Sequence, residues 1–354
     1  MPEFQWPTTR VSHTRYSVGP GALSQLRAYL EPLPARVPVI ADPDVWRIYG
    51  DAFRRAMHPC EALVLHVDGE QDKELDVVER LVFELVANRV HRRETVVVFG
   101  GGACCDIGGM VAMLYMRGMD YAVVATSLMA QIDAAIGGKV GCNAATRKNL
   151  LGGFHHAELV LIDPGFLATL PARQFRAALA EALKLGLLLP DLGVEPLLDA
   201  VIDGNFDALA LLVEQCVDGK LRLLDVDPFE DDLDRVLNLG HAVAHALEKA
   251  PGCRLLHGEA VAIGLAATAR YAAHEGDCSP QRASAIIAQI ERLGLPTTSD
   301  VTPADLLARL AEIPDHRGGR IRLVVPAGDA GVRVLDHCDL TLLTDCARGL
   351  PVAH

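Results

Sequence analysis

The first half of the chain alternates short apolar runs, rich in β-branched residues, with amphipathic stretches. The apolar runs lie at 37–41, 62–67, 95–100, 121–125 and 159–163, and helical periodicity falls between them, for example over 73–90. Strands that alternate with helices in this way predict a parallel sheet of the α/β class.

The pattern changes after about residue 165. Helical periodicity then dominates 172–189, 206–225, 236–249, 257–275 and 280–293, and strand-like runs follow at 320–326 and 331–336. We therefore predict two domains: an α/β nucleotide-binding domain over 1–165 and a mostly helical metal and substrate domain over 166–354. The cleft between two such domains is the expected active site.

Composition narrows the function classes. The chain of 354 residues has a formal net charge of −13, which argues against a nucleic-acid partner because such binding depends on Lys and Arg neutralising phosphates. No apolar window of about 18 residues and no basic-then-apolar N-terminus is present, so neither a membrane span nor a signal peptide is expected. The nine cysteines, irregularly spaced, then indicate reduced thiols in the cytoplasm.

A glycine-rich loop follows the most apolar run, in VVVFGGGACCDIGG. Glycines 100–102 allow a close approach to a pyrophosphate, and a helix starting near Asp106 would offer free N–H groups. The spacing is not GxGxxG, so a plain tight turn stays open as an alternative. Cys104 and Cys105 are interpreted as small buried residues. Glu70 and Lys73, taken alone, would be a solvated helix start.

Lysines then occur in an unusual setting. Lys139, Lys148 and Asn149, together with Asp133, lie among small apolar residues in a segment rich in Gly and Ala. A surface loop would carry more polar residues around its lysines. Cations in this setting favour a cleft that binds a phosphate or an array of sugar hydroxyls.

Candidate metal ligands appear in the helical half. Glu181 and Lys184 share one helix face, His241 and His245 are four residues apart, and His257 follows. Two histidines and a carboxylate around an open position are typical of catalytic zinc. Spacing alone does not say which two histidines bind, and core or helix-end histidines are the alternative.

Seven sequence blocks together resemble the sugar phosphate cyclase superfamily, whose best-known member is 3-dehydroquinate synthase, and the match as a whole runs in order from about Asp42 to about Val325. The blocks are FGGGACCDIGG, YMRGMDY, LMAQIDAAIGGK, RKNLLGGF, LAEALKLG, NLGHAVAHALE and LLHGEAV. The resemblance implies a Rossmann-like α/β domain followed by a mainly helical metal-binding domain. It also implies NAD as cofactor, zinc or cobalt as metal, and a homodimer.

The resemblance carries roles to individual residues. It makes the metal ligands Glu181, His241 and His257. It places NAD contacts at Asp42, Asp44, Glu70, Lys73, Gly101, Gly102, Asp106, Thr126 and Ser127. It gives catalytic positions to Asp133, Lys139, Lys184, Asn238 and His245, the last facing the substrate phosphate, and substrate-binding positions to Lys148, Asn149 and Lys220. Arg117 would reach across a dimer interface to the partner's phosphate site.

The same resemblance implies a reaction sequence. A hydroxyl-bearing carbon held at zinc is oxidised transiently with NAD, which acidifies the neighbouring C–H bond. Phosphate leaves by elimination, the hydride returns, the ring opens, and an intramolecular aldol step closes the carbocycle. NAD is not consumed, so the net reaction is of the lyase type.

Two positions depart from 3-dehydroquinate synthase. Those enzymes carry Arg four residues before the Asn of NLGH, where it serves the substrate carboxylate, whereas this chain has Asp234. An Asp would repel a carboxylate but accept hydrogen bonds from a hydroxymethyl group. In addition, His316 stands where a phosphate-site lysine is usual.

Both departures resemble the branch that uses sedoheptulose 7-phosphate, a seven-carbon ketose with CH2OH in place of the carboxylate. Its products are 2-epi-5-epi-valiolone, 2-epi-valiolone and desmethyl-4-deoxygadusol, and the sequence blocks look most like 2-epi-valiolone synthases. The rival hypotheses are 3-dehydroquinate synthase itself, a metal-dependent polyol dehydrogenase, and a non-catalytic binding protein.

Overall fold

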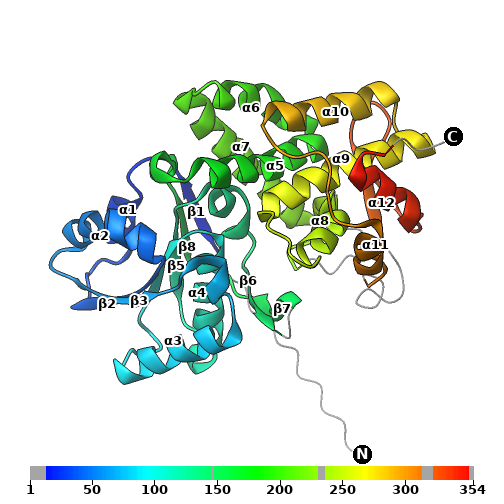
Figure 1. Ribbon diagram of the computed structural model, residues 1–354. Helices are drawn as coiled ribbons and strands as arrows, with labels where there is room; N and C mark the ends of the chain where they lie inside the picture. The colour runs from blue at the N-terminus through cyan, green and yellow to red at the C-terminus, as the bar shows by residue number, and fades with distance from the viewer. Residues whose placement is uncertain (1–12, 145–146, 230–235, 313–321, 351–354) are drawn as a thin grey trace, which may run out of the picture. The chain divides into compact units, whose positions relative to one another are not determined.

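The computed structural model describes residues 13–144, 147–229, 236–312 and 322–350 (Figure 1). It divides into two compact units. Unit 1 takes the chain up to Thr126 and the segment Gly137–Asp163, and unit 2 takes Ser127–Ile136 and the chain from Pro164 onward. The short segment Ser127–Ile136 thus belongs to unit 2 although the chain on both sides of it belongs to unit 1.

Unit 1 is built on a parallel sheet of six strands in the order β1-β8-β5-β4-β2-β3. The strands are β1 (Arg15–Val18), β2 (Arg36–Ala41), β3 (Glu61–His66), β4 (Val96–Gly100), β5 (Tyr121–Ala125) and β8 (Leu159–Ile162). Every residue of β4, β5 and β8 is buried, which explains their uninterrupted apolar sequences.

The helices of unit 1 connect these strands, and a hairpin extends from it. The helices are α1 (Ala22–Tyr29), α2 (Pro43–Met57), α3 (Leu75–Ala87) and α4 (Gly102–Leu114), with 3₁₀ turns η1 (Gly69–Asp72) and η2 (Tyr115–Arg117). The antiparallel hairpin joins β6 (Lys139–Ala144) to β7 (Arg147–Phe154), with a bulge between Cys142 and Ala144.

Unit 2 is mainly helical. Its α-helices are α5 (Ala172–Leu188), α6 (Val194–Ile202), α7 (Phe206–Val226), α8 (His241–Glu248), α9 (His257–Glu275), α10 (Pro280–Arg292), α11 (Pro303–Ala311) and α12 (Leu340–Arg348). Shorter elements are the π-helix η3 (Ala130–Ala134), the 3₁₀ turns η4 (Pro164–Thr169), η5 (Pro190–Leu192) and η6 (Val236–Asn238), and the antiparallel pair β9 (Leu323–Pro326) and β10 (Val332–Leu335). Helix α10 begins after the N-cap Ser279 with Pro280 in its first turn, as sequence rules expect.

The predicted fold class, a parallel α/β sheet followed by helices, is confirmed. Two predicted boundaries are wrong. Helix α4 begins at Gly102 and not near Asp106, because the glycine loop is shorter than expected and Gly101 already serves as the N-cap. The predicted helix 236–249 is broken at Gly240, whose φ of 79° ends η6 before α8 begins.

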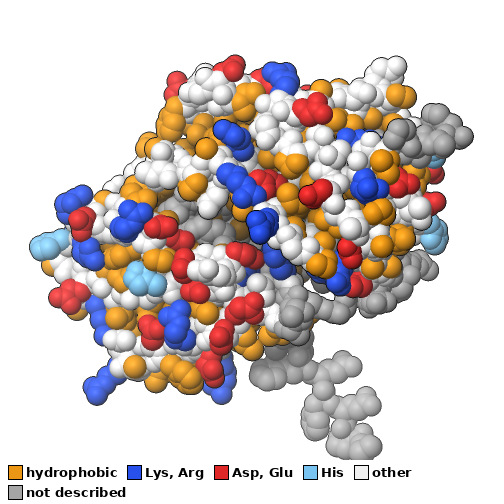
Figure 2. Space-filling model, in the orientation of Figure 1, with side chains coloured by type: hydrophobic (Ala, Val, Ile, Leu, Met, Phe, Trp, Pro, Cys, Tyr) orange, Lys and Arg blue, Asp and Glu red, His pale blue; other side chains and the backbone are white. Residues whose placement is uncertain are grey.

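Among the described residues, none of the helices is both long and apolar enough to cross a membrane. On the face drawn in Figure 2, acidic and basic side chains are interspersed over the surface, in keeping with the net acidic composition.

Candidate functional site

The carboxyl ends of three adjacent strands in unit 1 lie level with one another. Asp42 follows β2 and its N–H donates to the Phe99 carbonyl at 3.1 Å, and Thr126 follows β5 and donates to the Gly100 carbonyl at 3.0 Å. The Asp42 side chain is turned back to cap α2, where it accepts from the N–H groups of Asp44 and Val45. Ligands of open α/β sheets bind at this edge, outside the carboxyl ends of the strands.

The glycine loop lies at this same edge of the sheet, because it follows the carboxyl end of β4. Gly101 and Gly102 lead into α4, whose first N–H groups offer donors for a phosphate. Lys73 is only 5% exposed and forms an ion pair with Asp106 in α4. Lys73 is therefore not part of a solvated helix start, and that interpretation is wrong for this residue. Glu70 is exposed, with the Lys148 ammonium 3.8 Å from its carboxylate.

The β6–β7 hairpin carries three of the predicted substrate residues. Lys139 begins β6, and Lys148 and Asn149 lie exposed in β7. Asn149 has a φ of 52°, a left-handed conformation that is unusual for a non-glycine residue. Its N–H is held at 3.0 Å by the Asn143 side-chain oxygen, and the Asn143 N–H donates to the Lys73 carbonyl at 2.7 Å. Asn143 therefore connects Asn149 to Lys73.

In unit 2, three helices bring together the predicted metal ligands. Helix α5 carries Glu181, and α8 and α9 begin with His241 and His257. The helices approach closely because of two glycines: a Cβ on Gly258 would lie 1.8 Å from the Ala177 carbonyl oxygen of α5, and one on Gly264 would lie 2.0 Å from the Gly240 carbonyl oxygen. Larger residues at either position would separate the ligands.

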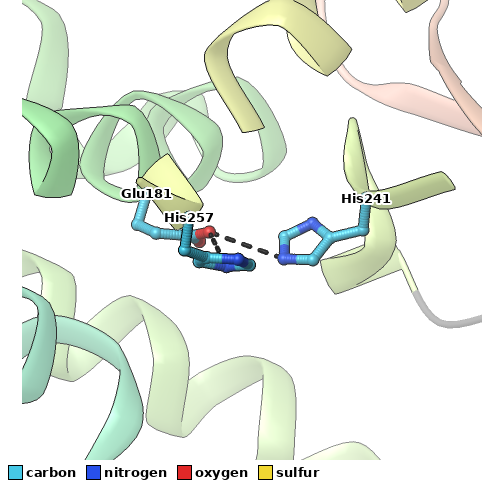
Figure 3. Close-up of side chains that lie close together, drawn as sticks. All are labelled: Glu181, His241 and His257. Atoms are coloured by element: carbon cyan, nitrogen blue, oxygen red, sulfur yellow. Dashed lines mark ion pairs between the residues drawn. The ribbon is translucent and has the colours of Figure 1, made fainter. Parts of the chain in front are cut away.

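Both imidazoles point toward the Glu181 carboxylate (Figure 3). The Nε2 atoms of His241 and His257 each lie 3.5 Å from the Glu181 Oε1 atom, and the three candidate ligand atoms lie within 4.8 Å of one another. Two atoms bound to one zinc in a tetrahedral site, each about 2.0 Å from the metal, are about 3.3 Å apart. The spacing therefore suits one metal ion.

The buried carboxylate gives a second reason to expect a metal. Glu181 is 1% exposed, and neither of its oxygens accepts a well-formed hydrogen bond from the described residues, although the Lys184 ammonium contacts it. Burial would raise the pKa of Glu181, but Lys184 and the histidines hold it well below its usual range. A buried anion with free lone pairs is what a cation site requires.

The two histidines differ in charge without a metal. Burial, helped by Lys184, lowers the pKa of His241 to about 3, so that its imidazole is neutral. Burial also acts to lower the pKa of His257, but Glu181 and Glu248 outweigh it and raise this pKa to about 10. A metal bound by these residues would therefore displace a proton from His257.

A second ion pair, between the buried Lys220 and the partly exposed Asp133, lies in the same unit. The Lys220 ammonium donates at 2.6 Å both to the Asp133 carboxylate and to the Asp133 carbonyl. Burial would raise the pKa of Asp133, but Lys220 holds it below its usual value. His245 lies next to the metal ligands, with its ring centroid 5.4 Å from that of His241. Asn238 lies in η6, just before α8.

The remaining predicted residues are placed as follows. Ser127 belongs to unit 2 and accepts from the Ala130 N–H at 3.2 Å. Arg117 is exposed with a φ of 68°. Asp234 and His316 lie outside the described residues. Two further residues near the site were not predicted. Nothing in the sequence indicated Asn143. Glu248 lies 3.4 Å from His257, and its spacing of seven residues from His241 on the same helix could have indicated it.

The matches to known proteins agree with this arrangement. Family models of the 3-dehydroquinate synthase N-terminal and C-terminal domains match residues 63–177 and 178–313. The chain belongs to the 3-dehydroquinate synthase family. The predicted resemblance is confirmed, and the protein is a sugar phosphate cyclase of that family.

Relatives within this family differ in their named products. The chain is 38% identical to a 2-epi-valiolone synthase of Stigmatella aurantiaca, over 94% of this chain and 85% of that protein. It is 35% identical to a 3-dehydroquinate synthase of Solibacter usitatus, over 93% and 94%. Among solved structures, the 2-epi-5-epi-valiolone synthase ValA from Streptomyces hygroscopicus subsp. jinggangensis 5008, with NAD+ and Zn2+ bound, aligns with a TM-score of 0.87 and 32% identity, covering 96% of this chain and 98% of ValA.

Proposed function

We propose that this chain converts sedoheptulose 7-phosphate to a C7 cyclitol, 2-epi-valiolone or 2-epi-5-epi-valiolone, and releases phosphate. The observation that carries the substrate choice is Asp234, which stands where 3-dehydroquinate synthases carry the carboxylate-binding Arg. A carboxylate beside this Asp would be repelled, whereas a hydroxymethyl group could donate a hydrogen bond to it. The names of the Stigmatella relative and of ValA support the same product class.

The proposed cofactors are NAD and zinc. NAD would lie at the strand ends of unit 1, and Glu181, His241 and His257 would hold the metal. When bound, zinc would coordinate two substrate hydroxyls and acidify one of them, and NAD would accept and return a hydride. Cobalt could replace zinc, because the donor set suits both ions.

Roles for the surrounding side chains follow from their charge. The Asp133–Lys220 pair offers a fixed donor and acceptor for sugar hydroxyls. The Lys184 ammonium keeps the Glu181 carboxylate, a proposed metal ligand, negatively charged. For the phosphate we propose Lys139, Asn149, Asn238 and His245, whose donors would stabilise it both when bound and when leaving, with His316 in place of the usual lysine and Lys148 binding the substrate.

We also propose a homodimer in which Arg117 reaches the partner's phosphate site. Arg117 is exposed, and so are the neighbouring apolar side chains of Leu114 and Met116, which are 48% and 49% exposed. Mixing inactive Arg117→Ala with inactive Lys184→Ala should restore activity, because each mixed dimer regains one complete site. Two variants that stay inactive together, in a chain shown by light scattering to be dimeric, would contradict this arrangement.

The cytoplasm is the proposed location. All nine cysteines are free thiols, as a reducing compartment requires.

The substrate proposal is tested by supplying NAD and zinc with either sedoheptulose 7-phosphate or the 3-deoxy-heptulosonate phosphate used by 3-dehydroquinate synthases. Phosphate release only with sedoheptulose 7-phosphate, with a cyclitol identified by NMR, is expected. The 35% identity to the Solibacter enzyme keeps 3-dehydroquinate synthase as the second candidate, and turnover of the carboxylated sugar alone would establish it. Net NADH formation from polyols would indicate a dehydrogenase, and absence of any bindable metal would favour a binding protein.

A further inference from the structure

The Nδ1 atoms of His241 and His257, the nitrogens that do not face Glu181, contact different partners. His241 places Nδ1 3.1 Å from the Leu239 carbonyl oxygen, whereas His257 places Nδ1 3.4 Å from the Glu248 carboxylate. Both rings therefore turn Nε2 toward Glu181. A carbonyl and a carboxylate both require a proton on Nδ1, which leaves the Nε2 lone pair for a metal.

The burial of the Glu248 carboxylate is explained by a contact outside its own helix. Its side chain is 5% exposed, and it is the last residue of α8, the helix that begins with His241. A buried carboxylate is costly unless charged or hydrogen-bonded groups face it. His257, the first residue of α9, supplies such a group. One end of α8 therefore carries the proposed ligand His241, and the other end contacts the proposed ligand His257.

We propose that Glu248 is a positioning residue that holds the Nδ1 proton of His257 and so orients this imidazole for the metal. A carboxylate in this place fixes the ring, selects the tautomer and makes Nε2 a stronger donor than a backbone carbonyl does. His257 then binds the metal more tightly than it would alone, while His241 stays the weaker donor. This inference rests on the proposed metal site.

The test measures the dissociation constants of Zn2+ and Co2+ by competition with a chelator, in the full-length chain. Glu248→Ala is expected to weaken both about 10- to 100-fold, and Glu248→Gln less, because an amide oxygen still accepts the Nδ1 proton but carries no charge. The visible absorption spectrum of the Co2+-loaded protein should change in both variants. Metal saturation should recover most of the turnover, because the proposed role of Glu248 is to strengthen metal binding by His257.

Glu275→Gln is the matched control. Glu275 also lies 3.1 Å from a histidine, His274, but this pair is at the far end of α9, and Glu275 is exposed. The control should bind metal as the wild type does. If Glu248→Ala does not fold, Glu248→Gln decides alone. Affinities within twofold of the wild type and an unchanged Co2+ spectrum would overturn the role of Glu248, whereas a wild-type chain that binds no metal would overturn the metal site itself.

Discussion

The two units differ in how they hold the predicted site residues. In unit 1 they follow the carboxyl ends of strands or lie in the hairpin, and many are exposed, among them Asp44, Glu70 and Lys139. In unit 2 they lie mainly on helices and several are buried, with Glu181 1% and Lys184 3% exposed. Backbone N–H groups can bind a nucleotide without any particular side chain, whereas a metal site depends on each ligand. Substitutions in unit 2 should therefore be more damaging than those in unit 1.

The largest effect is expected for Glu181→Gln. The amide is nearly isosteric but offers no charge to a metal and leaves the buried Lys184 ammonium without its anion. Turnover should fall by at least about 1000-fold, because the metal's stabilisation of developing charge is worth several kcal/mol. Metal content after dialysis, measured by mass spectrometry, should fall with it. A Glu181→Gln variant that keeps its metal and its activity would contradict the expectation that substitutions in unit 2 are more damaging than those in unit 1.

The next effect concerns the packing that assembles the ligands. Gly258→Ala would place a methyl group against the backbone of Ala177, which has no freedom to rotate away. We expect a loss of about 1–3 kcal/mol in the free energy of unfolding, measured with urea, together with weaker metal binding.

Gly219→Ala is its control. There the new methyl group would meet the tip of the flexible Leu192 side chain at 2.4 Å, and the exchange also improves helix propensity. It should change stability much less. Equal losses in the two variants would show that close backbone packing is not what holds α9 against α5.

A smaller and more selective effect is expected for Lys73→Met in unit 1. The change removes a buried cation and leaves Asp106 without its ion pair at the proposed NAD site. NAD should bind about 10- to 100-fold more weakly in calorimetry, in line with the loss of a charged hydrogen bond, while zinc affinity stays the same. Arg54→Met, in an exposed ion pair with Asp51, should leave NAD binding unchanged.

The smallest effect is expected for Asn143→Ala. The exchange removes the acceptor that holds the left-handed Asn149, so the KM for the sugar phosphate should rise a few-fold while kcat stays nearly constant. Asn143→Asp, which keeps the acceptor oxygen, should restore most of the affinity. A KM unchanged in Asn143→Ala would mean that the hairpin holds Asn149 without this contact.

Five of the six strands of the sheet could be predicted from their apolar runs, most clearly β4, β5 and β8, which are fully buried. Strand β1, with the sequence RYSV, was missed because it carries no such run. Local patterns were less informative where a distant partner decides. Taken alone, the pattern around Lys73 suggested a solvated helix start, because its ion-pair partner Asp106 lies 33 residues further along the chain. The helical spacing of apolar residues continues across Gly240, so this pattern did not indicate the break between η6 and α8.

The predicted metal ligands posed a different problem. The His241 and His245 spacing fits a metal as well as it fits a helix face, and residue spacing does not say which histidine faces Glu181. That choice depends on how α9 packs against α5 and α8. Gly258 permits the close approach to α5, and Gly264 permits the approach to Gly240 at the start of α8. The family resemblance supplied the assignment that periodicity left open.

The path of the chain between the units limits how they can be exchanged. The polypeptide passes from one unit to the other after Thr126, after Ile136 and after Asp163. A fragment beginning at residue 164 would contain the buried Lys220 but not Asp133, which arrives with the segment Ser127–Ile136. A chimaera that imports the helical unit of a relative must import this short segment as well, so recombination within the family should favour crossovers that keep the two pieces from one parent.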